Sequence, residues 1–192
     1  MKPALVIGLV GAESTGKTTL ARQLQQRLAL QGLRVERVDE TLRHFCDQHG
    51  RTPTPPEQWH IARAQTAAIH AAAARAELVI ADTTALMTAV YSDHVFGDTT
   101  LYPEAEAAHR RCGLSLLTAL DLPWEPDGLQ RDGPQVRAPI DALVRASLQR
   151  AGGPWALVAG CGEQRLDVAL AAVHQAWQRH QAQPGAGRPP LS

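Results

Sequence analysis

Residues 8–24 read GLVGAESTGKTTLARQL, a glycine-rich turn between an apolar run and a helical pattern. Gly11, Gly16, Lys17 and Thr18 follow the spacing G-x-x-x-x-G-K-[ST], the phosphate-binding P-loop pattern. The glycines let backbone N–H groups face phosphate oxygens, the lysine reaches the β and γ phosphates, and the threonine hydroxyl ligates Mg²⁺. ATP and Mg²⁺ are therefore the expected cofactors. The expected nucleotide-binding residues are Gly11, Ala12, Glu13, Ser14, Thr15, Gly16, Lys17, Thr18 and Thr19.

The composition indicates one globular domain with balanced charge. Of the 192 residues, 44% are apolar, and 19 basic side chains balance 19 acidic ones. This balance argues against nucleic-acid binding proteins, which concentrate basic residues. No apolar stretch approaches the ~18 residues of a membrane span, and the three widely spaced cysteines argue against a disulfide framework or a zinc site. We expect a cytoplasmic protein with a small-molecule substrate, without a nucleic-acid or membrane partner, and make no prediction of oligomeric state.

Apolar runs of strand length alternate with helical patterns along the chain. The predicted strands are 4–10, 33–40, 77–82, 114–121 and 155–160. One helix begins with a capping box, in which Thr54 and Glu57 flank Pro55. The alternation predicts an α/β fold with a mainly parallel, five-stranded sheet. We expect the folded domain to be 1–180 and the segment 181–192 to be a disordered tail.

Acidic residues follow the predicted strands and are expected to meet the P-loop at one edge of the sheet, because ligands bind at the carboxyl ends of parallel strands. Asp82 ends the apolar run LVIAD, where a Mg²⁺ ligand is typical; the alternative is a helix cap. Glu40 ends the second strand, and either Glu40 or Asp82 could accept the proton of an acceptor hydroxyl. The alternative for Glu40 is a solvated loop position. Asp121 ends the fourth predicted strand, where no Asn-Lys pair forms a guanine motif.

The segment LPWEPDGLQRDGPQVRAP, residues 122–139, is long for a connection and is typical of a lid or binding loop. From a mobile loop, Arg131 and Arg137 could neutralise a transferring phosphoryl group, while closure of the loop excludes water. The alternative is two surface arginines. Trp124 could stack on a substrate ring or pack in the loop.

Several segments together resemble the ribosylnicotinamide kinase domain of NadR-type proteins, which are P-loop NTPases with an AAA-like ATP-binding fold. These segments are GAESTGKTTL, IARAQ, VIADTTALMTAVYSDHVFG and DLPWEPDGLQ, and the likeness covers roughly residues 4–175. Two positions depart from the family pattern: Thr84 replaces an acid and Gln130 replaces an arginine.

The resemblance implies a nucleoside-kinase-like three-layer sandwich that phosphorylates the 5′-hydroxyl of nicotinamide riboside with ATP, giving the mononucleotide. It also implies roles for individual residues. Lys17 and Thr18 would serve ATP and Mg²⁺, and Arg137 would belong to the lid. The expected catalytic residues are Lys17, Glu40, Asp82, Arg131 and Arg137; the expected substrate-binding residues are Glu40, Arg43, Asp82, Trp124 and Asp127; the expected metal ligands are Thr18 and Asp82.

Two alternatives remain open at the level of sequence. The acceptor could be another nucleoside or small metabolite. The protein could instead be an ATPase or nucleotide-dependent switch that has no small-molecule acceptor. Phosphoryl transfer that depends on an acceptor separates the kinases from the switch.

Overall fold

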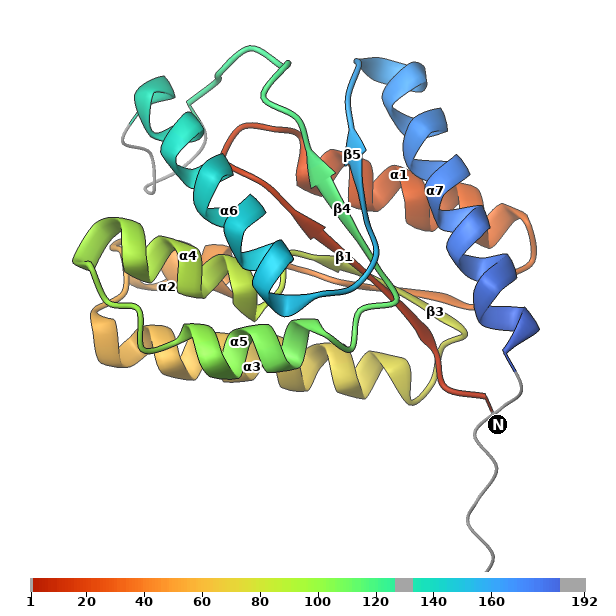
Figure 1. The fold of residues 1–192 in the computed structure, drawn as a ribbon, viewed down its shortest axis with the longest axis horizontal. Helices are drawn as coiled ribbons and strands as arrows, with labels where there is room; N and C mark the ends of the chain where they lie inside the picture. The colour runs from red at the N-terminus through yellow and green to blue at the C-terminus, as the bar shows by residue number, and fades with distance from the viewer. Residues whose placement is uncertain (1, 127–132, 184–192) are drawn as a thin grey trace, which may run out of the picture.

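Five parallel strands form the centre of the structure, a computed structural model that describes residues 2–126 and 133–183. The strands are β1 (Leu5–Val10), β2 (Val35–Val38), β3 (Leu78–Asp82), β4 (Leu114–Thr118) and β5 (Trp155–Val158). They lie in the order β2-β3-β1-β4-β5, and each neighbouring pair is parallel (Figure 1). The predicted α/β fold with a five-stranded sheet is confirmed, and β1, which leads into the P-loop, lies in the middle.

Helices connect the strands and cover both faces of the sheet. They are α1 (Lys17–Leu30), α2 (Thr41–His49), α3 (Pro55–Ala73), α4 (Ala85–Phe96), α5 (Tyr102–His109), the 3₁₀ turn η1 (Pro134–Val136), α6 (Arg137–Ala151) and α7 (Gly162–Ala182). Helices α1 and α7 form one outer layer, and α3, α4, α5 and α6 form the other (Figure 1). The predicted three-layer sandwich is therefore confirmed.

The core explains the continuous apolar run of β1. Leu5, Ile7 and Leu9 join a buried cluster with α1 and α7, whereas Val6 and Val10 join clusters on the opposite face. Alternate side chains of this strand are thus buried on both sides, as in a covered parallel sheet.

The ends of several elements differ from the prediction. Strand β4 ends at Thr118 rather than at Asp121, because residues 119–121 leave the sheet for a turn. Helix α6 already begins at Arg137, and a proline at position 139 is tolerated in its first turn. Helix α7 continues to Ala182, two residues beyond the predicted end of the domain. The rest of the predicted tail, 184–192, lies outside the described residues.

The structure also shows the cap of α3, the state of the cysteines and the apolarity of the helices. The predicted capping box begins α3, where the carboxylate of Glu57 accepts from the Thr54 N–H at 2.8 Å. The three cysteines are free thiols, of which Cys46 is buried, Cys112 is half-buried and Cys161 is exposed. Within residues 2–126 and 133–183, no helix is long and apolar enough to cross a membrane.

Candidate active site

The P-loop has the backbone shape that its glycines permit. Gly16 precedes α1 with a φ of 76°, in the left-handed region that favours glycine. Gly11 has a φ of 144°, and a Cβ there would lie 2.2 Å from the Thr118 hydroxyl oxygen. The loop therefore packs directly on the end of β4, and the N-terminal end of α1 points at the site that phosphate would occupy.

Thr15 holds the loop in this shape through its side chain. Its hydroxyl donates to the Ala12 carbonyl at 2.7 Å and lies 2.7 Å from the Thr118 hydroxyl, which in turn bonds the Val10 carbonyl at 3.3 Å. The Thr15 side chain is fully buried. Of the predicted nucleotide-binding residues, Thr15 therefore offers a ligand its backbone rather than its hydroxyl.

Lys17, Glu40, Arg43 and Asp82 interact electrostatically and form a charge cluster at the carboxyl end of the sheet. Burial lowers the pKa of Lys17, and the carboxylates of Glu40 and Asp82 oppose that shift. Burial raises the pKa of Glu40, although the Lys17 ammonium opposes this. The guanidinium of Arg43 lies 3.5 Å from the Glu40 carboxylate, whose side chain is 15% exposed. The structure thus brings these four predicted residues together.

Asp82 has the free oxygen that a magnesium ligand needs. The residue is 2% exposed, and its Oδ1 has no hydrogen-bond partner among the described residues. In the β1–β3 pairing Asp82 lies beside Leu9, and Leu9 is two residues before Gly11 of the P-loop. Thr18 lies in the first turn of α1. Among the described residues, no group of three or more His, Cys, Asp or Glu side chains forms a metal site. A Mg²⁺ ion here would therefore share its ligands with nucleotide phosphates and water, as is usual for this cation.

Gln65 is a site residue whose role the sequence did not reveal. It is 2% exposed on α3; its Oε1 accepts from the Thr41 N–H at 2.8 Å, and its Nε2 donates to the Thr83 carbonyl at 3.3 Å. Thr83 has a φ of 76°, which is strained for a residue with a Cβ. Since Thr41 follows Glu40 and Thr83 follows Asp82, one glutamine holds the backbone next to both carboxylates.

Arg137 does not belong to a loop, as was predicted, but to the start of α6. It is 8% exposed and donates from Nη1 to the Leu122 carbonyl at 2.9 Å. Its Nε and Nη2 have no hydrogen-bond partner within the described part of the chain. A buried guanidinium with unused donors is suited to an anion. Two other predicted site residues, Asp127 and Arg131, lie outside the described residues, as does Gln130.

The segment 122–125 lies against the P-loop. The indole N–H of Trp124 donates to the carboxylate of Glu13 at 3.3 Å. The hydroxyl of Ser14 accepts from the Glu125 N–H at 2.8 Å and donates to the Glu125 carbonyl at 3.2 Å. Trp124 therefore has a partner in the P-loop itself, which favours loop packing over the predicted stacking on a substrate.

Asp121 and Thr84 both have structural partners in the folded chain. Asp121 binds the Gly160 N–H at 2.6 Å and the Arg165 guanidinium at 2.8 Å, so it serves the loops behind the P-loop. Thr84 caps α4 and lies 2.9 Å from the Nδ1 of the buried His109. The Thr84 side chain, which replaces the acid of the family pattern, is therefore buried in the core.

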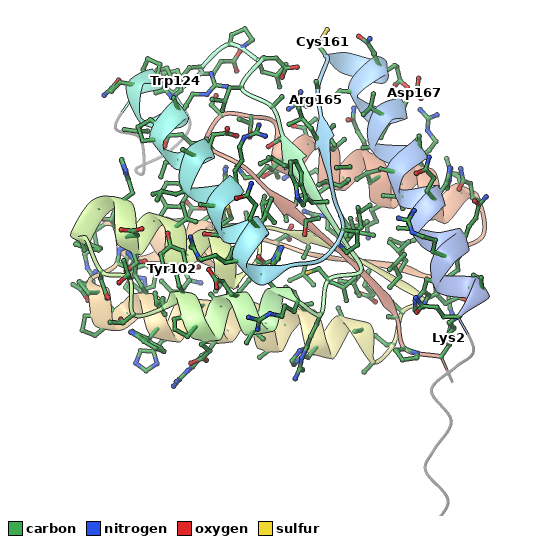
Figure 2. The ribbon with its side chains drawn as sticks, in the orientation of Figure 1. Lys2, Tyr102, Trp124, Cys161, Arg165 and Asp167 are labelled. Atoms are coloured by element: carbon green, nitrogen blue, oxygen red, sulfur yellow. The ribbon has the colours of Figure 1, made fainter. Side chains whose placement is uncertain are left out.

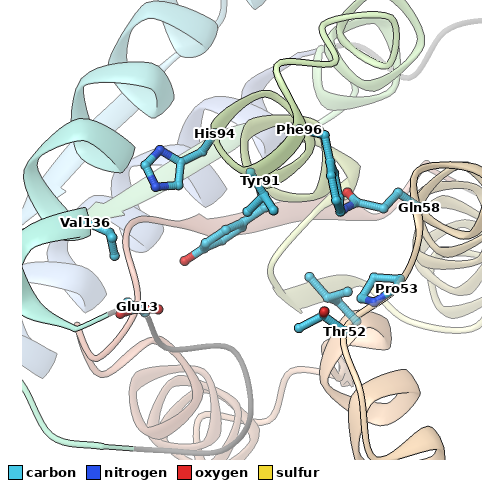
Figure 3. Close-up of a pocket in the computed structure, with 10 residues that line it drawn as sticks. Glu13, Thr52, Pro53, Gln58, Tyr91, His94, Phe96 and Val136 are labelled. Atoms are coloured by element: carbon cyan, nitrogen blue, oxygen red, sulfur yellow. The ribbon is translucent and has the colours of Figure 1, made fainter.

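Two cavities border the P-loop, one on each side. The larger, of about 580 Å³, is lined among others by Ser14, Gly16, Thr19, Leu122, Gly162 and Arg165. The smaller, of about 140 Å³, is lined among others by Glu13, Thr52, Gln58, Tyr91, His94 and Phe96 (Figure 3). Glu13 and Ser14 are neighbours in sequence, so that the P-loop contributes one of them to each cavity.

Comparison with solved structures gives the same fold. A NadR protein in complex with NR matches with a TM-score of 0.69 at 20% identity, over 98% of this chain and 52% of that chain. The chain thus spans about half the length of that NadR protein. Deoxyadenosine kinase from M. mycoides matches with a TM-score of 0.57 at 11% identity, over 89% of this chain and 99% of that chain. Thymidylate kinase from Ehrlichia chaffeensis matches with 0.62 at 12%, over 90% and 98%.

At these identities the likeness shows the fold, and it confirms the fold that the NadR-type motifs imply. No curated protein sequence matches the chain. Residues 6–165 match the protein family described as an AAA domain. The matched range runs from β1 and the P-loop to the first turn of α7. Because the match covers well over half of the 192 residues, the chain belongs to the AAA domain family.

Proposed function

We propose that the protein is an ATP-dependent kinase that phosphorylates the 5′-hydroxyl of nicotinamide riboside. The observation that carries this proposal is the pair of cavities on opposite sides of the P-loop, with the charge cluster of Lys17, Glu40 and Asp82 beside it. A phosphoryl transfer enzyme needs a donor and an acceptor on either side of the transferred group. Such a kinase would act in the cytoplasm and supply NAD biosynthesis.

The larger cavity suits the nucleotide. It contacts the outer side of the P-loop at Ser14 and Gly16 and extends along α1 to Gln23. Its walls also include the 122–126 segment and the start of α7. With its phosphates in the P-loop, ATP would extend its base into this space.

The smaller cavity suits a cationic aromatic acceptor. Glu13, which is 7% exposed, gives it a carboxylate, and Tyr91 and Phe96 give it aromatic rings. None of its described lining residues is a lysine or arginine. A carboxylate and aromatic faces attract a pyridinium ring, whereas an acceptor that already carries a phosphate would find only His94 as a side chain that can become cationic among the described lining residues.

Gln58 supplies the polar contact in this cavity. It is 4% exposed, and its Oε1 has no hydrogen-bond partner among the described residues. A buried acceptor without a donor costs free energy that a ligand N–H can recover. The carboxamide group of nicotinamide is such a donor.

The charge cluster can carry out the transfer. The Glu40 carboxylate would accept the proton of the 5′-hydroxyl while the hydroxyl oxygen forms a bond to the γ phosphorus and the bond between that phosphorus and ADP breaks. Lys17 and the unused donors of Arg137 would neutralise the charge on the transferred group. We assign the base to Glu40 rather than to Asp82, because the free Oδ1 of Asp82 suits Mg²⁺. Asp82 and Thr18 would hold Mg²⁺, which would supply charge neutralisation at the phosphates.

The test is transfer from γ-labelled ATP in the presence of Mg²⁺ to a panel of acceptors, with Lys17→Ala as the negative control. The panel contains nicotinamide riboside, nicotinic acid riboside, neutral nucleosides and thymidine monophosphate. We expect labelled nicotinamide mononucleotide as the main product. Transfer to a neutral nucleoside instead would support the kinase assignment but reject nicotinamide riboside as the acceptor. Hydrolysis or binding of ATP without transfer to any acceptor would reject the kinase in favour of a nucleotide-dependent switch.

A further inference from the structure

Arg165 in the first turn of α7 connects three loops at the nucleotide end of the sheet. It is only 4% exposed, and an arginine so deeply buried needs partners for its charge and its N–H groups. Nη1 donates to the Asp121 carboxylate and to the Gly160 carbonyl, each at 2.8 Å, and Nη2 donates to the Thr15 carbonyl at 2.8 Å. Figure 2 shows Arg165 at the same end of the domain as Trp124. The side chain therefore joins the P-loop to the loops that follow β4 and β5.

The contact with Thr15 determines the direction of a P-loop amide. The described chain contains no cis peptide bond, and in a trans peptide the C=O and the next N–H point in opposite directions. Because Nη2 of Arg165 holds the Thr15 carbonyl, the N–H of Gly16 points to the other side of the loop. P-loop N–H groups that face the interior of the turn bind phosphate oxygens.

The bond from Arg165 restrains the backbone carbonyl of Thr15 rather than its side chain. The Thr15 side chain is fixed separately, by the Ala12 carbonyl and the Thr118 hydroxyl. Gly16 follows with a φ of 76°, and glycine has more freedom to rotate than any other residue. A rotation of the Thr15–Gly16 peptide would turn the N–H away from phosphate, and the bond from Arg165 opposes that rotation.

Asp121 fixes Arg165 in place. Burial opposes ionisation of Asp121, but the Gly160 N–H and the Arg165 guanidinium outweigh it and lower the pKa of the carboxyl. The Gly160 N–H donates to the second carboxylate oxygen at 2.6 Å. The ion pair, with 5% of the Arg165 side chain exposed, is thus maintained at neutral pH.

We propose that Arg165 is a positioning residue for nucleotide binding: through the Thr15 carbonyl it holds the Gly16 N–H toward the phosphates, with Asp121 as its anchor. The inference rests on the proposed function only in requiring that the P-loop binds a nucleotide. It does not depend on the identity of the acceptor.

The test compares Arg165→Lys, Arg165→Gln and Asp121→Asn with the wild type, using calorimetric titration with ATP and Mg²⁺ and thermal melting. Lysine retains the charge but cannot span Thr15, Gly160 and Asp121 from one planar group. We expect Arg165→Lys to bind ATP about tenfold more weakly while the KM of the acceptor changes by less than about twofold. Asp121→Asn should weaken ATP binding in the same direction, and the double variant should show less than the sum of both effects.

The matched control is Arg27→Gln. Arg27 forms an exposed ion pair of 3.0 Å with Glu163, two residues before Arg165 on the same helix. We expect this variant to bind ATP like the wild type. The proposal would be overturned if Arg165→Lys binds ATP like the wild type. It would also be overturned if Arg27→Gln loses as much ATP affinity as Arg165→Lys. If the wild type itself does not bind ATP, the proposed function fails instead.

Discussion

The Lys17 ammonium donates to the Ala12 carbonyl, 2.7 Å away and five residues earlier in the same P-loop. The bond turns the side chain back over the loop, where Glu40 and Asp82 stabilise its charge against burial. Lys17 is therefore preorganised at the place where the P-loop amides converge.

Lys17→Ala should abolish most of the turnover and leave the fold intact. Removal of one preorganised charge from a transferring phosphoryl group costs about 10²–10³-fold in kcat. The measurement is kcat with labelled ATP beside a thermal melt. Lys2→Ala is the control, because the Lys2 ammonium bonds the Gln183 carbonyl at the opposite end of the sheet. Full activity in Lys17→Ala would refute the P-loop assignment.

Asp82→Asn should reduce turnover far more than ATP affinity. The amide keeps the size of the side chain but is a poor Mg²⁺ ligand, so we expect kcat to fall by about 10²-fold and the Mg²⁺ requirement to rise. A Mg²⁺ titration of the rate, after removal of metal with a chelator, measures both. Asp167→Asn on the exposed side of α7 is the control. If Asp82→Asn has the same rates as the wild type, Asp82 has only a structural role.

Glu40 should determine the acid limb of the pH–rate profile. A base must be ionised to accept the hydroxyl proton, and burial raises the pKa of Glu40 above its ordinary value of 4.5. As the pH falls, activity should therefore be lost at a higher pH than an ordinary glutamate would cause. Glu40→Gln should lower kcat by about 10²–10⁴-fold and remove this limb. An unchanged profile in Glu40→Gln would show that another group is the base; Glu36→Gln, at the Arg75 ion pair, is the control.

Glu13 should select a positively charged acceptor. Nicotinamide riboside and its reduced form have nearly the same shape, but only the oxidised ring is a cation. The wild type should prefer the cation, and Glu13→Gln should raise the KM of the cation about tenfold while the KM of the neutral form stays nearly constant. Steady-state kinetics with both acceptors measure the difference. Equal loss for both acceptors would mean that Glu13 supports the loop, through Trp124, rather than recognising charge.

His109 should make the fold sensitive to acid. It is 4% exposed, and burial lowers its pKa from 6.5 to about 4. The folded state therefore binds fewer protons than the unfolded state between these values, so stability is full above pH 6.5 and is lost as the pH falls toward 4. The difference amounts to about 3 kcal/mol in the free energy of unfolding.

Urea unfolding at about pH 7 and about pH 4 measures this loss. His109→Gln should lose less stability over that range than the wild type, whereas the exposed control His60→Gln should lose as much. His109 bonds Thr84 at 2.9 Å and Ser115 at 2.8 Å, so the variant has a lower stability at neutral pH. An identical pH dependence in His109→Gln would contradict the prediction.

The sequence by itself determined the fold class and the phosphate end of the site. The P-loop spacing from Gly11 to Thr18 is a local backbone requirement, and the apolar run before it needs a covered strand. The positions of Glu40 and Asp82 in the sequence are enough to group them, because both follow strands whose carboxyl ends meet at one edge of the sheet.

Only the tertiary structure decided what the other candidates contact at that edge. Asp121 also follows a strand, but the chain turns after Thr118 and the Asp121 carboxylate forms an ion pair with Arg165. Gln65 belongs to the IARAQ segment that resembles the NadR-type pattern, but it lies on a helix remote in sequence from both carboxylates, so its bonds to the backbone beside them could not be predicted. Contacts between distant segments have no periodicity or spacing in the sequence, since they arise from how the layers pack against one another.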